Sequence, residues 1–287
     1  MKYGIVTRSF PNMTVAESAE KMRSYGYRYT ELCYTHTDWT GWVYGGSHDL
    51  AAFGYTPQTC KEKADILRAY GIEPVSLGVF SGLVRPDEEF SATCMDFFRR
   101  NIEFAAEAGI PNISTELGFR AEWRGLHAAE YESDFARVKQ RVGDLAEFAK
   151  PYGVSIAIEA CVIDVIPSAK RLRDFIDQIR VERGLTNVKS LLDPANFIAN
   201  SDEDDLFKYL APHVAYFHGK DRKYNDAYGR ILGEGEIDWV KFFENYFVLT
   251  PQIPFILEYT NEQTAELTNE RVRIFSRRAL ANLKLKG

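Results

Sequence analysis

AYGIEPVSL (69–77) is one of four similar phrases that decide the fold, the others being SYGYRYTEL (24–32), EAGIPNIST (107–115) and PYGVSIAIE (151–159). Each follows an amphipathic stretch typical of a helix, has a glycine where that helix ends, and then enters an apolar strand. Glycine suits this position because the residue that ends a helix often adopts the left-handed conformation. Each phrase therefore predicts the junction between a helix and the strand that follows it.

Two of these helices also carry start signals. Thr14 and Glu17 in TVAE have the spacing of a capping box. In TPQT, Thr56 is the expected N-cap and Pro57 the first helical residue.

The same pattern extends along the chain. Strands are expected near residues 3–7, 29–34, 73–79, 112–117, 154–160, 188–193, 214–218 and 254–259. Helical patterns alternate with them, among them 57–70, 87–108, 129–149, 168–180, 203–210, 238–246 and 264–283. A doubly wound open sheet uses the same local units, but this many repeats without a flexible linker favour closure. The chain is predicted to be α/β, a single (β/α)8 TIM barrel forming one catalytic domain over residues 1–287.

Composition limits the partners. The 287 residues are 45% hydrophobic and 26% charged, with a formal net charge of −6 and a pI near 5.5. This balance argues against a nucleic-acid partner, and no apolar run is long enough to cross a membrane. The N-terminus lacks the apolar core of a signal peptide. Four scattered cysteines without a CxxC pair fit reduced core thiols, so we expect a cytoplasmic protein; they are Cys33, Cys60, Cys94 and Cys161.

Ionisable residues end four consecutive predicted strands. SIAIEA ends in Glu159, KSLLDPAN contains Asp193, AYFHGKD contains His218 and FILEYT contains Glu258. The C-terminal strand ends of such a barrel form one rim, so these side chains are expected to meet there. Three carboxylates in a dry pocket would repel one another, and a divalent cation removes that conflict. Three oxygen donors and one nitrogen predict one divalent metal ion, manganese before magnesium, cobalt or zinc.

At these residues the sequence resembles the xylose isomerase-like TIM-barrel superfamily of sugar isomerases and epimerases. The resemblance covers essentially the whole chain, through IAIEA, LLDPANF, HGKD, LGEGEIDW (232–239) and ILEY, in that order. It implies that Glu159, Asp193, His218 and Glu258 are the ligands of a single metal ion, and that the glutamates also act as acid and base. It also implies a small carbohydrate substrate and a homodimer or homotetramer.

The sequence departs from the ketose 3-epimerases of that superfamily at three positions. Those enzymes have a histidine where this chain has Asn196, an arginine at Tyr224 and a second glutamate at Val165. The positions contact sugar hydroxyls in the epimerases, so the substrate is expected to differ. The HxKD form with Lys220 is closer to inosose dehydratase. A DNA-repair endonuclease would need further zinc-binding histidines, which disfavours that activity.

The site predicts chemistry on a carbon next to a carbonyl. A metal that chelates the carbonyl and a neighbouring hydroxyl would acidify the C–H bond and stabilise the enediolate. Glu159 and Glu258 would remove and return the proton. The leading hypothesis is therefore an isomerase or epimerase of a small sugar or keto-sugar. The alternative is a lyase, either a keto-inositol dehydratase or an eliminating enzyme on a 3-keto glycoside; a non-catalytic carbohydrate-binding barrel would not require both glutamates.

Other residues are candidates for substrate contacts. Lys220 is expected at the rim, contacting a substrate oxygen or pairing with a carboxylate, while Asp221 is expected to be structural. Asn196 either orients substrate or caps a loop, and Glu116 ends the fourth strand. The long aromatic loop 35–55, with His36 and Trp39, suits a lid that stacks on a sugar ring or an oligomer contact. Inside the second strand, Glu31 is expected to be an ion-paired residue of the barrel interior.

Overall fold

Eight parallel strands close on themselves as a barrel in the computed structural model, which describes residues 1–41, 47–118, 128–225 and 228–286. The barrel strands are β1 (Tyr3–Ile5), β2 (Tyr29–Leu32), β5 (Glu73–Gly78), β6 (Asn112–Thr115), β7 (Ser155–Ile158), β8 (Val188–Leu192), β9 (Val214–Gly219) and β10 (Phe255–Leu257). Around the barrel they run in the order β1-β10-β9-β8-β7-β6-β5-β2. The predicted (β/α)8 barrel is therefore confirmed.

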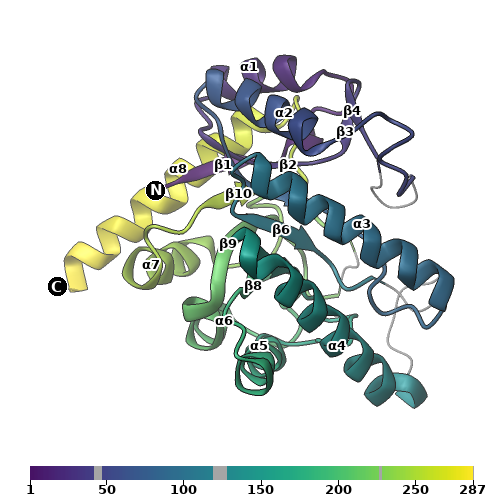
Figure 1. Ribbon diagram of the computed structural model, residues 1–287. Helices are drawn as coiled ribbons and strands as arrows, with labels where there is room; N and C mark the ends of the chain where they lie inside the picture. The colour runs from purple at the N-terminus through teal and green to yellow at the C-terminus, as the bar shows by residue number, and fades with distance from the viewer. Residues whose placement is uncertain (42–46, 119–127, 226–227, 287) are drawn as a thin grey trace.

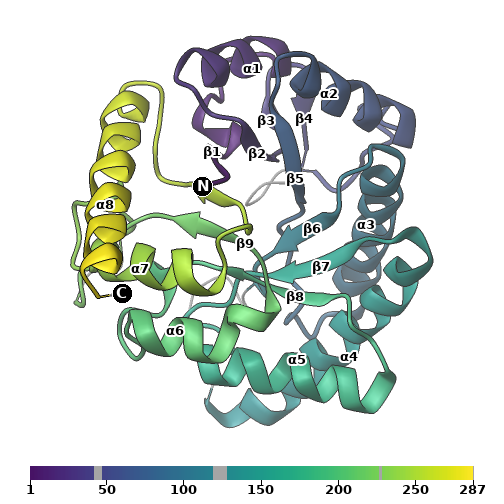
Figure 2. The ribbon, with the colours of Figure 1, turned by 90° about the vertical axis from the view of Figure 1, so that its left-hand side faces the viewer.

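Helices alternate with these strands and surround the barrel (Figures 1 and 2). They are α1 (Val15–Ser24), α2 (Pro57–Ala69), α3 (Glu88–Glu107), α4 (Tyr131–Ala149), α5 (Ala169–Arg183), α6 (Glu203–Leu210), α7 (Trp239–Leu249) and α8 (Ala265–Lys286). Short 3-10 helices are η1 (Thr7–Ser9), η2 (Ala128–Glu130), η3 (Lys150–Tyr152), η4 (Pro194–Asn196) and η5 (Ala211–His213). The far end of α8 projects beyond the barrel in Figure 1. No helix in the described part of the chain combines the length and apolarity needed to span a membrane.

The local signals in the sequence match the backbone. The glycines of the four repeated phrases, Gly26, Gly71, Gly109 and Gly153, all have positive φ, between 65° and 87°. Thr14 and Glu17 form the predicted capping box at α1, and Thr56 caps α2 with Pro57 in its first turn. These helix-to-strand junctions are therefore built as predicted.

Two hydrophobic clusters form the core. The larger fills the layer between the strands and the helices. The smaller one fills the inside of the barrel and consists of Val6, Val75, Ala157, Leu191, Tyr216 and Ile256. Because side chains alternate along a strand, the residue two positions after an inward-facing residue lies on the same inner face as long as the backbone stays extended.

The structure adds one element that the sequence did not predict. The strands β3 (Thr35–His36) and β4 (Trp39–Thr40) form a small antiparallel hairpin after β2.

The four cysteines are buried and unpaired, as expected for core thiols.

Candidate metal centre

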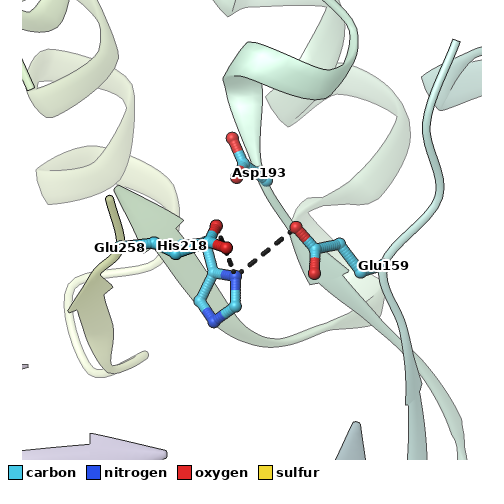
Figure 3. Close-up of side chains that lie close together, drawn as sticks. All are labelled: Glu159, Asp193, His218 and Glu258. Atoms are coloured by element: carbon cyan, nitrogen blue, oxygen red, sulfur yellow. Dashed lines mark hydrogen bonds and ion pairs between the residues drawn. The ribbon is translucent and has the colours of Figure 1, made fainter. Parts of the chain in front are cut away.

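The four predicted ligands follow interior core residues at a spacing of two. Ala157 precedes Glu159, Leu191 precedes Asp193, Tyr216 precedes His218, and Ile256 precedes Glu258. Strand alternation therefore turns all four side chains into the barrel at the C-terminal ends of β7, β8, β9 and β10. In Figure 3 the four side chains approach one another from these elements.

The cluster is tight and buried. One ligand atom from each of Glu159, Asp193, His218 and Glu258 lies within 4.8 Å of all the others. None of the four residues is more than 5% exposed. Nδ1 of His218 lies 3.4 Å from Oε1 of Glu159 and 3.3 Å from Oε2 of Glu258 (Figure 3).

Glu31 holds the opposite edge of the His218 ring. Its Oε2 lies 3.2 Å from Nε2 of His218 and accepts the hydroxyl of Tyr216, while Ser114 donates to the same oxygen at 3.0 Å. The pairing of Glu31 with Arg8 at 3.3 Å confirms its predicted place in a barrel-interior ion pair. A proton kept on Nε2 by Glu31 leaves the lone pair of Nδ1 facing the cluster, which is the arrangement that outer carboxylates give to metal-binding histidines.

Two cationic side chains contact the carboxylates. The Lys220 ammonium lies 2.7 Å from Oδ2 of Asp193, 2.9 Å from Oε2 of Glu258 and 3.3 Å from Oε1 of Glu159. Arg8 pairs with the other oxygen of Glu258 and with Glu31. Since His218 must be neutral to bind a metal, these four carboxylates face only two positive charges among the contacts that the structure describes. One divalent cation would balance the difference.

Burial and electrostatic interactions with neighbouring charges shift the pKa values of the carboxyl groups in the cluster. Burial raises the pKa of Asp193 to about 7; the Lys220 ammonium opposes this rise, and the Glu159 and Glu258 carboxylates add to it. Burial also acts to raise the pKa of Glu258, but Lys220 and Arg8 together hold that pKa well below its ordinary range. Without a metal, the crowding of negative charge therefore falls mainly on Asp193.

A second observation also indicates that these four residues suit a metal ion. Oε2 of Glu159 is buried and has no hydrogen-bond partner among the described residues. An orphaned buried carboxylate oxygen is costly, and a bound cation would satisfy it. The donor set of three carboxylates and one imidazole suits a hard or borderline divalent ion.

The side chain of Asn196 forms a hydrogen bond with Glu159. It lies in η4 directly after Asp193, is 3% exposed, and donates from Nδ2 to Oε1 of Glu159 at 3.0 Å. Its backbone carbonyl also accepts from Val162. The amide therefore fixes one oxygen of Glu159 and links the loops after β7 and β8.

Asp221 has the structural role expected of it. It is fully buried, and its carboxylate accepts from the backbone amides of Arg222, Gly233 and Ile237. The indole of Trp239 donates to the same carboxylate at 2.8 Å. Asp221 thereby ties the loop after β9 to the start of α7, through the LGEGEIDW motif.

Replacing Asp221 by asparagine is expected to destabilise the protein. The amide nitrogen of asparagine cannot accept the hydrogen bonds that one carboxylate oxygen now receives, so the free energy of unfolding should fall by about 2 kcal/mol. Chemical denaturation of Asp221→Asn beside the parent measures this. Asp49→Asn, which changes an exposed loop aspartate, is the control; equal losses in both variants would contradict the role given to Asp221.

The aromatic loop is not built as predicted. Trp39 is fully buried, stacks on Tyr34 with ring centroids 4.8 Å apart, and packs at a tilt against Tyr55 with centroids 4.2 Å apart. His36 is also buried, and its Nδ1 lies 3.1 Å from the carbonyl of Met13. Both rings are buried because the β3–β4 hairpin turns them into the core, and their predicted substrate contacts stay predictions. Residues 42–46 of the loop interpreted as a lid fall outside the described residues.

His36 makes a pH-dependent contribution to stability. Burial lowers its pKa to about 4, whereas an unfolded histidine titrates near 6.5. The unfolded state therefore binds more protons between these values, so the contribution is complete above pH 6.5 and is lost as the pH falls towards 4. It amounts to roughly 2 kcal/mol after structural relaxation. Urea unfolding at pH 7 and 4.5 should show a smaller acid loss in His36→Asn than in the parent, and identical losses would refute this.

The remaining candidate substrate contacts lie at the rim. Glu116 follows β6 and is half-buried. Arg8, which contacts Glu258 and Glu31, was not among the predicted site residues. Arg8 lies in η1, beyond the end of β1, where the alternation of side chains along a strand no longer predicts which way a side chain points.

The fold and the site together define a TIM-barrel protein with a candidate metal centre at the C-terminal rim. The sequence profile of xylose isomerase-like TIM barrels matches residues 19–278. The chain therefore belongs to the xylose isomerase-like TIM-barrel family, as its motifs indicated.

Solved structures share this fold at low sequence identity. A D-tagatose 3-epimerase-like protein is similar with a TM-score of 0.78 and 17% identity, over 99% of this chain and 100% of its own. L-Ribulose 3-epimerase has a TM-score of 0.74 and 15% identity, over 99% and 97%. The IolI protein, solved with a bound zinc atom, has a TM-score of 0.71 and 16% identity, over 98% and 97%. No curated protein matches the chain in sequence.

Proposed function

We propose that the chain is a divalent-metal-dependent isomerase or epimerase of a small sugar or keto-sugar. The observation that carries the proposal is the convergence of Glu159, Asp193, His218 and Glu258, whose ligand atoms lie within 4.8 Å of one another inside the barrel rim. Membership of the xylose isomerase-like family and the similarity to sugar epimerases support it.

The metal would be held by these four side chains. When bound, a divalent ion would polarise a substrate carbonyl and a neighbouring hydroxyl, which acidifies the intervening C–H bond. The oxygen-rich donor set favours manganese, with magnesium, cobalt and zinc as alternatives. The bound zinc of IolI supports a divalent ion in this fold.

Glu159 and Glu258 would act as acid and base. Their carboxylates approach the cluster from opposite sides in Figure 3, so one can remove a proton from one face and the other can return it from the opposite face. Asn196 keeps Oε1 of Glu159 oriented, and Arg8 does the same for Glu258. Return of the proton to the same carbon gives epimerisation, and return to the neighbouring carbon gives isomerisation through the enediolate.

A lyase is the second candidate, and Lys220 favours it. Its ammonium lies 2.9 Å from Glu258 and 3.3 Å from Glu159, beside both candidate acid–base groups. Its ammonium can donate a proton to a departing hydroxyl or alkoxide, which an epimerase does not need. A keto-inositol or a 3-keto glycoside would then be the substrate class.

Deuterated water separates these reactions. Metal-loaded protein is incubated with a panel of ketoses, keto-inositols and 3-keto glycosides, and the products are followed by NMR. Deuterium at the carbon next to the carbonyl, without loss of water or aglycone, is the result expected of an isomerase or epimerase. A released aglycone or a new enone would establish the lyase instead, and the absence of both exchange and elimination across the panel would count against both reactions.

A further inference from the structure

A hollow opens directly beside Glu258. Its volume is about 280 Å³, and it lies between the end of β1 and the end of β10. Its lining residues are Val6, Arg8, Ser9, Glu258, Tyr259 and Thr260. Because Glu258 belongs to both the hollow and the metal centre, a molecule reacting at the centre can extend into this space.

Tyr259 forms the aromatic wall of the hollow. It has a φ of 53°, and no other non-glycine residue of the described chain has a positive φ. This conformation is costly for a tyrosine, and such strain is concentrated at functional positions. The side chain is 52% exposed, and the Lys220 ammonium lies 5.3 Å from its ring centroid.

The loop after β9 packs against the Tyr259 ring. Gly229 packs so closely that an added Cβ would lie 2.5 Å from a ring atom of Tyr259. The next residue, Arg230, pairs with the backbone of Asp221 in both directions at 2.8 Å. The exposed aromatic ring is therefore held in place by the same loop that Asp221 anchors.

The polar groups of the hollow suit hydroxyl groups. Ser9 is 6% exposed, and its hydroxyl has no hydrogen-bond partner among the described residues. Thr260 supplies a second hydroxyl, which donates to the carbonyl of Glu258 at 3.3 Å. Aromatic faces combined with hydroxyl groups are well matched to a sugar ring, which presents C–H groups on its faces and hydroxyls at its edge.

The charges of the hollow disfavour an anionic ligand. Arg8 is its cationic side chain, and that guanidinium already pairs with both Glu258 and Glu31. A phosphate would compete with two buried carboxylates for one arginine and would lie against the Glu258 carboxylate. The occupant is therefore expected to be neutral.

From these observations, we infer that the hollow is a subsite for a neutral, hydroxylated second ring attached to the reacting sugar. The substrate is then a glycosylated keto-sugar rather than a free or phosphorylated monosaccharide. This inference rests on the proposed function, because it places the reacting carbonyl at the metal centre. It adds Tyr259, Ser9 and Thr260 as residues that select the substrate.

Paired sugars test the subsite by calorimetry on metal-loaded protein. The probes are D-fructose, lactulose and isomaltulose, which share a fructose unit; the last two carry a second ring on different hydroxyls. At least one of the two disaccharides should bind about tenfold more tightly than fructose, consistent with one stacked ring. Equal affinities for all three would overturn the subsite alone. Absence of binding by all three would count against the proposed function and, with it, against this inference.

Substitutions of the lining residues test whether this hollow causes the preference for a disaccharide. Tyr259→Gly removes the ring while accepting the left-handed backbone, so it should fold and lose the preference for the disaccharide, with a far smaller change for fructose. Tyr259→Phe should retain the preference, and Ser9→Ala should weaken it. Tyr152→Ala, which removes a tyrosine of similar exposure in η3, should behave as the parent. A preference that survives in Tyr259→Gly would overturn the role of this hollow.

Discussion

Glu159→Gln and Glu258→Gln are each expected to slow solvent exchange at the substrate carbon by roughly 10² to 10⁴-fold, the range that a positioned general acid or base contributes. Glutamine keeps an oxygen that can act as a ligand but cannot accept the proton. The rate of deuterium incorporation into the best substrate of the panel, followed by NMR, measures the effect.

Two measurements separate loss of proton transfer from loss of structure. The metal content of each variant is determined in the same samples, because both glutamates are also candidate ligands. Glu103→Gln, on the outer helix α3, is the control; its side chain accepts from Tyr152 and does not contact the cluster. Exchange at the parental rate in metal-loaded Glu159→Gln or Glu258→Gln would remove that residue from the acid–base pair.

Lys220→Met is expected to bind a divalent ion about a hundredfold more tightly than the parent. The ammonium contacts three of the four candidate ligands at 2.7 to 3.3 Å, so a metal ion must displace it and then tolerate its charge. Even at the moderate effective dielectric of a protein site, like charges a few ångströms apart oppose binding by several kcal/mol, of which movement of the lysine recovers a part. Titration with Mn²⁺, followed by calorimetry, gives the affinity.

In the metal-free protein, the same substitution should lower stability. Without Lys220 the carboxylates lose a counter-charge that contacts three of them, so the thermal midpoint of metal-free Lys220→Met should fall, and added Mn²⁺ should restore most of it. Lys63→Met, which removes a lysine paired with Asp38 at 2.6 Å, is the matched control for losing one ion-paired lysine. A metal affinity no higher than that of the parent would show that Lys220 does not compete for the site.

The clustering of the four candidate ligands could be predicted because two local rules act together. Each strand end was visible as an apolar run, and alternation of side chains sets the inner face, as in the step from Ile256 to Glu258. Closure of the barrel then brings together residues that lie far apart in the sequence. The strand ladders end a little earlier than predicted, so Glu159, Asp193 and Glu258 stand just beyond them, at the rim.

Other features depended on packing that no local pattern encodes. A loop rich in aromatic residues is equally compatible with an exposed binding surface and with a buried aromatic cluster. In this structure the pairing of β3 with β4 buries Trp39. No pattern in the sequence predicts the left-handed backbone conformation of Tyr259, because tyrosine rarely adopts it. Lys220 was expected at the rim, but its simultaneous contact with three carboxylates follows from the shape of the closed barrel.

Metal stoichiometry tests the central claim most directly. Parent protein and Asp193→Ala are stripped, reloaded with Mn²⁺, dialysed, and analysed by inductively coupled plasma mass spectrometry. The parent should retain about one ion per chain, and Asp193→Ala should retain little, because the remaining donors leave the ion under-coordinated. Equal metal retention by the two proteins would contradict a metal centre formed by Glu159, Asp193, His218 and Glu258.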